Sequence, residues 1–255
     1  CSWYDAERKG QLIDTQTSYA LPLAFHVVDG DLQKKMAAHL AAAIKTPMAG
    51  YPAYSLLTGF IGTAWISKAL SDNGMSEEAY RLLQYEGYPS WLYPVKNGAT
   101  TIWERLNSYT VKDGFGENNS MNSFNHYSFG AVASWMYNYS LGICRDEKSP
   151  GFKHFILKPE VDPTRGITHA EGYYDSMYGR ISSRWQYTDS GIRYEFTVPA
   201  NTTASLYLPA PAVSFISENG KPLKKASGVR YVSADKELHH LELASGSYQF
   251  DIKQK

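Results

Sequence analysis

The sequence predicts a chain of two parts, a helical part followed by an antiparallel β-sandwich. Apolar residues recur at helical spacing up to Gly142, and after it they alternate with polar residues at a period of two. A charged, turn-rich stretch at 145–151 lies between the two patterns. The length of 255 residues also favours two domains. We therefore expect a helical domain at 1–145 and a β-sandwich domain at 152–255.

The helical part begins with four predicted helices. Met36, Leu40 and Ile44 recur at helical spacing, and Asp31 is a candidate cap for their helix. Ser76 is a second candidate cap, since acidic residues follow it in the first turn. The segment 88–94, rich in aromatic residues and proline, is expected to be extended. The four helices are expected at Thr17–Val28, Leu32–Ile44, Leu57–Leu70 and Ser76–Leu83.

A fifth helix is predicted at Ser123–Ile143, and it has an unusual pattern. One stripe is apolar and includes Val132 and Trp135. The opposite stripe, which includes His126 and Tyr137, is small or partly polar and carries no charge. A helix with two uncharged faces is expected to be buried on both sides, as is the inner helix of a helical barrel.

The second part reads as short strands separated by turns. Tyr194, Phe196 and Val198 alternate with polar residues, and similar alternation recurs near Leu206 and Phe250. Turn signals such as Asp189-Ser190-Gly191 and Glu218-Asn219-Gly220 separate these runs. This arrangement is typical of an antiparallel sandwich.

Composition excludes several classes of function. The 25 basic and 25 acidic residues balance, so nothing suggests a nucleic-acid partner or a membrane surface. No apolar run reaches the ~20 residues that a membrane-spanning helix needs. The two cysteines, Cys1 and Cys144, form no metal or disulfide pattern, and we expect neither a metal site nor a cofactor. The compartment cannot be read from the sequence.

Chemistry is suggested by two short segments. Trp103-Glu104-Arg105 places a carboxylate beside an indole, and Ser123-Phe124-Asn125-His126-Tyr127 follows about twenty residues later. Aromatic faces hold sugar rings and a carboxylate activates water, so this combination favours a sugar-cleaving site. A structural Glu104 that pairs with an arginine is the simpler alternative. A hydrogen-bonded core role is likewise the alternative for His126.

Four motifs, in order, resemble the C-terminal half of the catalytic domain of bacterial α-L-rhamnosidases, glycoside hydrolase family 78. The resemblance covers most of residues 12–190, and Tyr178-Gly179-Arg180-Ile181 with Trp185 resembles the start of the closing β-sandwich in that family. The motifs are Leu57-Thr58-Gly59-Phe60-Ile61-Gly62-Thr63, Tyr88-Pro89-Ser90-Trp91-Leu92-Tyr93-Pro94-Val95, Gly98-Ala99-Thr100-Thr101-Ile102-Trp103-Glu104-Arg105 and Met121-Asn122-Ser123-Phe124-Asn125-His126-Tyr127.

The resemblance implies the second half of an (α/α)6 barrel, followed by a β-sandwich, in an inverting hydrolase that removes terminal α-L-rhamnose. It implies that Glu104 is the general base and that His126 contacts the sugar. Trp103 and Asn125 are weaker substrate-binding candidates, since Trp103 equally suits a core and Asn125 equally suits a backbone contact. The sequence departs from the family at Leu106-Asn107, where Trp-Asp is more common, which affects the expected pocket rim.

The general acid of that family lies in a segment rich in Asp, Arg and Trp, and we find no such segment here. We therefore expect a fragment that supplies the base and is inactive by itself. Half a barrel would expose inner faces, so we also expect it to associate with the missing N-terminal half or with itself.

Two alternative functions stay open. The chain could be a non-catalytic carbohydrate-binding or scaffold fragment, whose sandwich binds sugar or only supports the helices. It could instead belong to another (α/α)6 glycosidase, such as an unsaturated uronyl hydrolase. That enzyme needs a cationic wall for a uronate carboxylate, and few basic residues besides Arg105 lie near Glu104 in the sequence.

Overall fold

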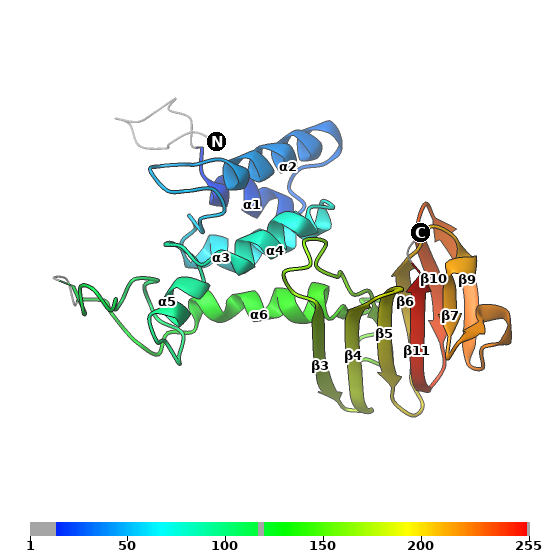
Figure 1. Cartoon of the computed structure of the whole chain (residues 1–255). Helices are drawn as coiled ribbons and strands as arrows, with labels where there is room; N and C mark the ends of the chain where they lie inside the picture. The colour runs from blue at the N-terminus through cyan, green and yellow to red at the C-terminus, as the bar shows by residue number, and fades with distance from the viewer. Residues whose placement is uncertain (1–13, 117–119, 254–255) are drawn as a thin grey trace. The chain divides into compact units, whose positions relative to one another are not determined.

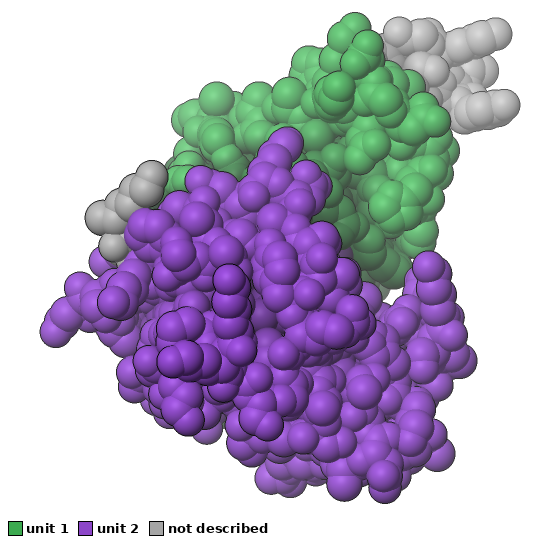
Figure 2. Space-filling model, turned by 90° about the vertical axis from the view of Figure 1, so that its right-hand side faces the viewer, with its two compact units in different colours: residues 1–133 green, residues 134–255 purple. Residues whose placement is uncertain are grey.

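The computed structural model describes residues 14–116 and 120–253. The chain divides into two compact units, residues 1–133 and residues 134–255, which Figure 2 shows in different colours. The first unit is helical and the second consists of β-sheets (Figure 1). The general prediction of a helical part followed by an antiparallel-rich β part is therefore confirmed.

The helical unit packs short helices around an aliphatic core. The helix α1 lies against α2 and α3, and α3 lies against α4. Leu23, Leu40, Ile66 and Leu82, one from each of these helices, are almost fully buried. The helices of this unit are α1 (Gln16–Ala24), α2 (Gly30–Lys45), α3 (Phe60–Asp72), α4 (Ser76–Gln84) and α5 (Leu92–Lys96).

The first four predicted helices are confirmed, with changes at their ends. The first helix starts at Gln16 because Thr15 and Ser18 form a capping box, and it ends at Ala24, just before His26 enters the left-handed region at φ 53°. The expected caps are wrong at two positions. Asp31 lies in the first turn of α2, whose N-cap is Asp29, and Ser76 is the first residue of α4 itself.

The segment at 88–94 is only partly extended. The peptide bond between Tyr88 and Pro89 is cis, and the chain then turns into the short helix α5 at Leu92. The hydroxyl of Ser90 accepts a hydrogen bond from the backbone N–H of Tyr93 at 3.1 Å, which fixes this turn.

The predicted fifth helix is too long at both ends. Helical structure runs only from Ser128 to Ser140, as a 3₁₀ turn, the α-helix α6 (Val132–Trp135) and a π-type turn. Gly142 in the left-handed region at φ 69° stops it, and Ile143 already belongs to a strand. The predicted second buried face is also wrong in this chain, because Tyr137 is exposed and His126 precedes the helix.

The β unit contains two sheets, and all strand pairs are antiparallel except that between β2 and β6. In neighbour order the five-stranded sheet is β1 (Ile143–Arg145), β2 (His154–Leu157), β6 (Thr203–Pro209), β10 (Leu238–Leu243) and β9 (Val229–Asp235). The six-stranded sheet is β3 (His169–Ser176), β4 (Gly179–Thr188), β5 (Gly191–Val198), β11 (Gly246–Lys253), β7 (Ile216–Glu218) and β8 (Lys221–Pro222).

The predicted alternation is present in these strands. Tyr194 and Phe196 on β5, Leu206 on β6 and Phe250 on β11 are buried, while their neighbours along each strand are more exposed. Trp185 on β4 is fully buried, and its indole N–H donates to the backbone oxygen of Ser140 at 2.8 Å. The two predicted turns lie between β4 and β5 and between β7 and β8.

Within the described ranges, none of the helices combines the length and apolar character that crossing a membrane requires.

Candidate active site

Two loops of the helical unit hold the predicted catalytic segments together. The backbone N–H of Glu104 donates to the carbonyl of Ser123 at 2.8 Å. The backbone N–H of His126 donates to the carbonyl of Ile102 at 2.8 Å. The two segments are about twenty residues apart in sequence, and these bonds place them side by side. Because the backbone of Ser123–Tyr127 is hydrogen-bonded to the other loop, this segment is not part of the helix that follows it.

The carboxylate of Glu104 is anchored by this pairing. Its Oε2 accepts a hydrogen bond from the backbone N–H of Ser123 at 2.8 Å. The side chain is partly buried, and it forms no ion pair with any residue in the described ranges. The simple structural role, a glutamate paired with an arginine, is therefore not what the geometry shows. One oxygen is fixed, while Oε1 has no hydrogen-bond partner among the described residues.

Glu104 lines a hollow of about 460 Å³ whose other walls are mainly aromatic or aliphatic. Among its described lining residues, Glu104 is the one carboxylate and Arg105 the one cation. This combination of apolar walls with a few polar groups is typical of a small-ligand site. The lining residues are Tyr51, Leu56, Leu57, Thr58, Gly59, Phe60, Tyr88, Pro89, Glu104, Arg105, Leu106, Asn107 and Phe129.

A buried glutamine fixes one wall of the hollow. Gln16, at the start of α1, donates from Nε2 to the carbonyl of Ser55 at 2.9 Å. Its Oε1 accepts from the backbone N–H of Leu57 at 2.9 Å. The extended chain that leads to Phe60 is thereby attached to the helical core.

The wall at Arg105 is shaped by a tight turn. The buried hydroxyl of Ser108 accepts from the backbone N–H of Arg105 at 3.2 Å and donates to the Arg105 carbonyl at 2.9 Å. Leu106 and Asn107 lie within this turn and line the hollow. The two positions at which the sequence departs from the family pattern thus do lie at the pocket wall.

Electrostatics in the hollow keep Tyr88 protonated. Burial raises the pKa of the Tyr88 phenol above its ordinary value of 10.0, and the neighbouring Tyr51 and Tyr93 act in the same direction. The positive charge of Arg105 opposes this by lowering the pKa of Tyr88. The phenol is therefore a neutral hydrogen-bonding group at ordinary pH.

His126 reaches the hollow through an aromatic neighbour. Its ring stacks on Phe60, with centroids 4.7 Å apart and 24° between the planes, and Phe60 lines the hollow. The Nδ1 atom of His126 accepts from the backbone N–H of Ser128 at 3.4 Å. His126 is not itself a lining residue, so it stands behind Phe60 with its Nε2 atom available.

Of the two weaker candidates, one is buried and the other is exposed. Trp103 is almost fully buried and packs edge-on against Phe124 at 5.2 Å, so it supports the loop. Asn125 is exposed, and its backbone N–H donates to the hydroxyl of Ser123 at 3.2 Å. Neither lines the hollow.

Tyr51, Phe60 and Tyr88 were not identified as site residues from the sequence. Phe60 and Tyr88 occur in the motifs of the resemblance, but an aromatic residue in an apolar stretch predicts a core position equally well. Their distinguishing feature is that they border the same hollow as Glu104, which depends on the tertiary fold.

No candidate metal centre is present among the residues that the structure describes, since no three His, Cys, Asp or Glu side chains gather there. His239 and His240 point to opposite faces of β10, as their spacing predicts. His239 is buried and its Nε2 lies 3.1 Å from the carbonyl of Ala210, while the Nε2 of His240 lies 3.0 Å from Glu242.

The helical unit, which is followed by a β unit, carries in its hollow the side chains that sugar-processing proteins use, since aromatic faces hold sugar rings and a carboxylate activates water. Comparison with known families identifies it further. Residues 2–140 match the model of the bacterial alpha-L-rhamnosidase 6 hairpin glycosidase domain. Residues 142–222 match the model of the bacterial alpha-L-rhamnosidase C-terminal domain. The chain belongs to the bacterial α-L-rhamnosidase family.

Curated relatives agree with this assignment. The chain is 35% identical over 248 residues to an alpha-L-rhamnosidase of Streptomyces avermitilis, which covers 97% of this chain and 22% of that protein. It is 34% identical over 241 residues to an alpha-L-rhamnosidase of Alteromonas sp., which covers 94% of this chain and 24% of that protein. The chain therefore spans about a quarter of the length of these relatives, and corresponds to their C-terminal portion.

Solved structures show the same fold. The α-L-rhamnosidase of Streptomyces avermitilis, solved with L-rhamnose, superposes with a TM-score of 0.82 at 34% identity, over 99% of this chain and 22% of that chain. An α-L-rhamnosidase from Dictyoglumus thermophilum superposes with a TM-score of 0.78 at 26% identity, over 99% of this chain and 27% of that chain.

Proposed function

We propose that this chain is the C-terminal portion of an inverting glycoside hydrolase that removes terminal α-L-rhamnose, and that Glu104 is its general base. The observation that carries the proposal is the carboxylate of Glu104, anchored through Oε2 at the edge of an aromatic hollow. Relatives named alpha-L-rhamnosidases along nearly the whole chain support the substrate class.

Anchoring suits the task of a base in an inverting reaction. The base must hold a water molecule between itself and the anomeric carbon and accept its proton as the bond to the sugar forms. The N–H of Ser123 fixes Oε2 and orients the carboxylate, which leaves Oε1 to bind that water. The carboxylate must be ionised for this step.

The second carboxyl group comes from outside this chain. An inverting enzyme places its two carboxyl groups ~6.5–9.5 Å apart on opposite sides of the sugar. Glu104 is the one carboxylate among the described residues that line the hollow. We therefore assign the general acid, which protonates the leaving oxygen, to another part of a longer protein.

The hollow offers a sugar both apolar and polar contacts. Phe60 and Tyr88 present aromatic surface, and Arg105 and Asn107 present hydrogen-bond donors. In this proposal His126 binds a sugar hydroxyl through its Nε2 atom beside Phe60.

The two remaining candidates have different parts in this proposal. The exposed amide of Asn125 contacts the substrate from the loop surface. Trp103 acts from behind Glu104, because its buried ring holds the loop that carries the base.

The proposal extends to architecture. We assign residues 1–145 to the second half of an (α/α)6 barrel and residues 152–255 to a β-sandwich. The other half of the barrel is then supplied by the rest of a longer protein, or a second copy covers the open side. The TM-scores against rhamnosidase structures support this assignment.

The test compares variants of the intact protein that contains this sequence, with a chromogenic aryl α-L-rhamnoside as substrate. Glu104→Gln should reduce kcat by about 10²–10⁴-fold, because the base is lost while the shape of the side chain is kept. KM should change little. Proton NMR of the first product should show the inverted anomer. Glu86→Gln is the matched control, since Glu86 pairs with Lys96 and does not line the hollow.

Three results would refute the proposal. Full turnover by the Glu104→Gln protein would show that Glu104 is not the general base. Turnover by the 255-residue chain alone that equals that of the intact protein would show that the acid is within this chain. Cleavage of unsaturated uronides in place of rhamnosides would assign the site to the other class of barrel enzyme.

A further inference from the structure

A second hollow lies on the outward face of the six-stranded sheet, within the β unit. Its volume is about 710 Å³, and its lining residues come mainly from β3, β4, β5 and β11. Strand register explains why it exists. Tyr173, Ser182, Thr197 and Ser247 are cross-strand neighbours in one row, and three of the four are small. We call this hollow the sheet trough and this row its floor.

The next row along the strands forms one wall of the trough. Glu171, Arg184, Glu195 and Gln249 are cross-strand neighbours and have long side chains. On the opposite side stands Arg180, which pairs with Asp175. A floor of short side chains between rows of long ones makes a depression that runs across the strands.

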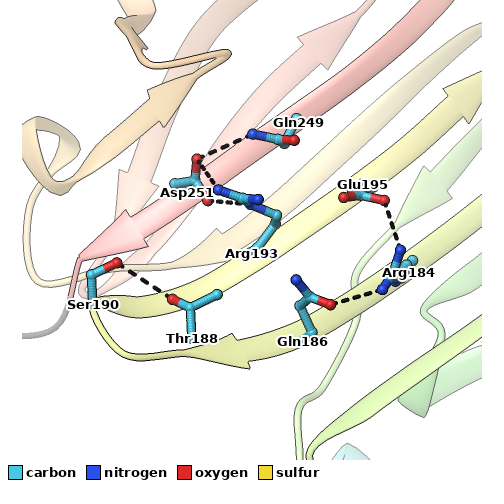
Figure 3. A network of polar contacts seen from close by, with 8 residues as sticks. All are labelled: Arg184, Gln186, Thr188, Ser190, Arg193, Glu195, Gln249 and Asp251. Atoms are coloured by element: carbon cyan, nitrogen blue, oxygen red, sulfur yellow. Dashed lines mark hydrogen bonds and ion pairs between the residues drawn. The ribbon is translucent and has the colours of Figure 1, made fainter.

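Polar contacts hold the wall in place before any ligand arrives. Arg184 donates to the carboxylate of Glu195 at 3.4 Å and to the amide oxygen of Gln186 at 2.8 Å (Figure 3). Gln249 donates to Asp251 at 3.4 Å, as Figure 3 also shows. Side chains fixed in this way lose little freedom on binding, which favours recognition.

The floor, in contrast, has unused hydrogen-bonding capacity. The hydroxyls of Ser182, Thr197 and Ser247 have no side-chain hydrogen bond to any residue in the described ranges. Each hydroxyl can donate one bond and accept others. Adjacent strands are ~4.8 Å apart, so neighbouring floor hydroxyls can bond to different hydroxyls of one sugar ring.

Charge and shape limit what can occupy the trough. Two glutamates and two arginines line it, so their charges balance and an ionic ligand gains no net attraction. Tyr173 is about half exposed and forms one end of the floor, with the guanidinium of Arg180 3.7 Å from its ring centre. An aromatic ring next to hydroxyl, amide and guanidinium groups matches a neutral polyol with one apolar face.

We infer that the sheet trough is a binding site for a neutral saccharide chain. One sugar ring lies against the face of Tyr173 that the guanidinium of Arg180 leaves uncovered. Further sugar units of the chain bond to the floor hydroxyls and to Arg184 and Gln249, because the floor crosses four strands and is too wide for one ring. The site is separate from the hollow at Glu104 and does not depend on that residue being catalytic.

The test is a titration of the whole 255-residue chain, labelled with ¹⁵N, followed by NMR. The probe is a neutral oligosaccharide of three α-linked L-rhamnose units, and trigalacturonate serves as the charged comparison. Amides of β3, β4, β5 and β11 should shift with the neutral probe, with Kd on the order of millimolar for an open polar site. Trigalacturonate should bind at least about fivefold more weakly, since binding partly desolvates its carboxylates and a trough without net charge offers no attraction in return.

Two variants on one strand make the result specific. Ser182→Phe fills the floor and should weaken binding at least about tenfold, while Thr188→Phe adds the same bulk outside the trough and should change Kd less than about twofold. Both side chains face outward on β4, so neither substitution disturbs the core. Tyr173→Ala should weaken binding by an intermediate factor.

Several outcomes would overturn the inference. Absence of any shift in these four strands at ~50 mM probe would do so. Equal affinity of the Ser182→Phe and Thr188→Phe proteins for the neutral probe would also overturn it. Stronger binding of trigalacturonate than of the neutral probe would be a further contradiction. Shifts confined to residues that line the hollow at Glu104 would refute the trough and leave the proposed catalytic site intact.

Discussion

The two units differ in how completely each covers its apolar residues. In the β unit, large side chains such as Trp185, Tyr194 and Phe250 are fully buried. Among the described residues of the helical unit, by contrast, four aliphatic side chains are each at least 69% exposed, namely those of Val27, Ile61, Val111 and Met121. In the described part of the β unit Met177 alone is as exposed, and the other exposed large apolar residues are mostly tyrosines, which carry a hydroxyl.

This difference supports the proposal that another polypeptide covers part of the helical unit. Exposed aliphatic side chains form no hydrogen bonds with water. Larger apolar patches usually mark a surface that another polypeptide covers. The proposed half barrel gives a reason for this exposure, because a missing half would bury it.

The largest effect should come from the core of the β unit. Trp185→Ala removes a fully buried indole and its bond to Ser140, and should lower the free energy of unfolding by about 3–5 kcal/mol. Urea titration followed by circular dichroism measures this change. Met177→Ala is the control, because Met177 is 82% exposed and should change stability by less than about 0.5 kcal/mol. Equal losses in the two variants would contradict a closed β core.

A somewhat smaller effect should appear in self-association. Alone in solution, the chain should associate, and Ile61→Gln with Met121→Gln should weaken that association at least about tenfold, since burying one such side chain contributes about 1.5–3 kcal/mol. Sedimentation equilibrium measures the change, with Met177→Gln as the matched control in the β unit. A wild-type chain that stays monomeric at ~100 μM would contradict this prediction, because its exposed apolar side chains would then not cause association.

The smallest effect concerns an exposed ion pair of the β unit. The hydrogen bond from Arg180 holds the pKa of Asp175 below its ordinary value of 3.8. A lowered pKa in the folded state means that the pair stabilises the fold above pH 3.8, and that this contribution is lost as the pH falls through the lower folded value. Because both groups are exposed, salt should weaken the effect further.

Carbon NMR of the Asp175 carboxyl group against pH measures this shift. Arg180→Gln should return the midpoint to about 3.8. An unchanged midpoint in that variant would show that another group sets the pKa of Asp175.

Much of the fold could be predicted because it follows local periodicity. Helices such as Leu32–Ile44 and strands such as that through Leu206 and Leu208 repeat apolar residues at the spacing of their secondary structure. The sequence predicts helix at Ser123–Tyr127, but the backbone of this segment is hydrogen-bonded to Ile102 and Glu104, about twenty residues earlier. A pattern read along the chain contains no information on such pairing.

The candidate site shows the same division. Short motifs make Glu104 and His126 candidates in the sequence, and the structure brings their loops together. Phe60 and Tyr88 were missed, since their place at the hollow depends on how Gln16 attaches the chain before α3. The sheet trough was also out of reach, because it arises from the register of four strands.

The hydrogen bond between the Glu104 carboxylate and the backbone N–H of Ser123 has one more consequence. The partner of the carboxylate is a peptide N–H, which every residue except proline possesses, so the identity of side chain 123 is immaterial to it. Replacing Ser123 by any residue except proline should therefore keep this bond to the carboxylate, although it removes the bond between the Ser123 hydroxyl and the backbone N–H of Asn125. The path of the main chain at position 123, and not the side chain there, sets the orientation of the Glu104 carboxylate.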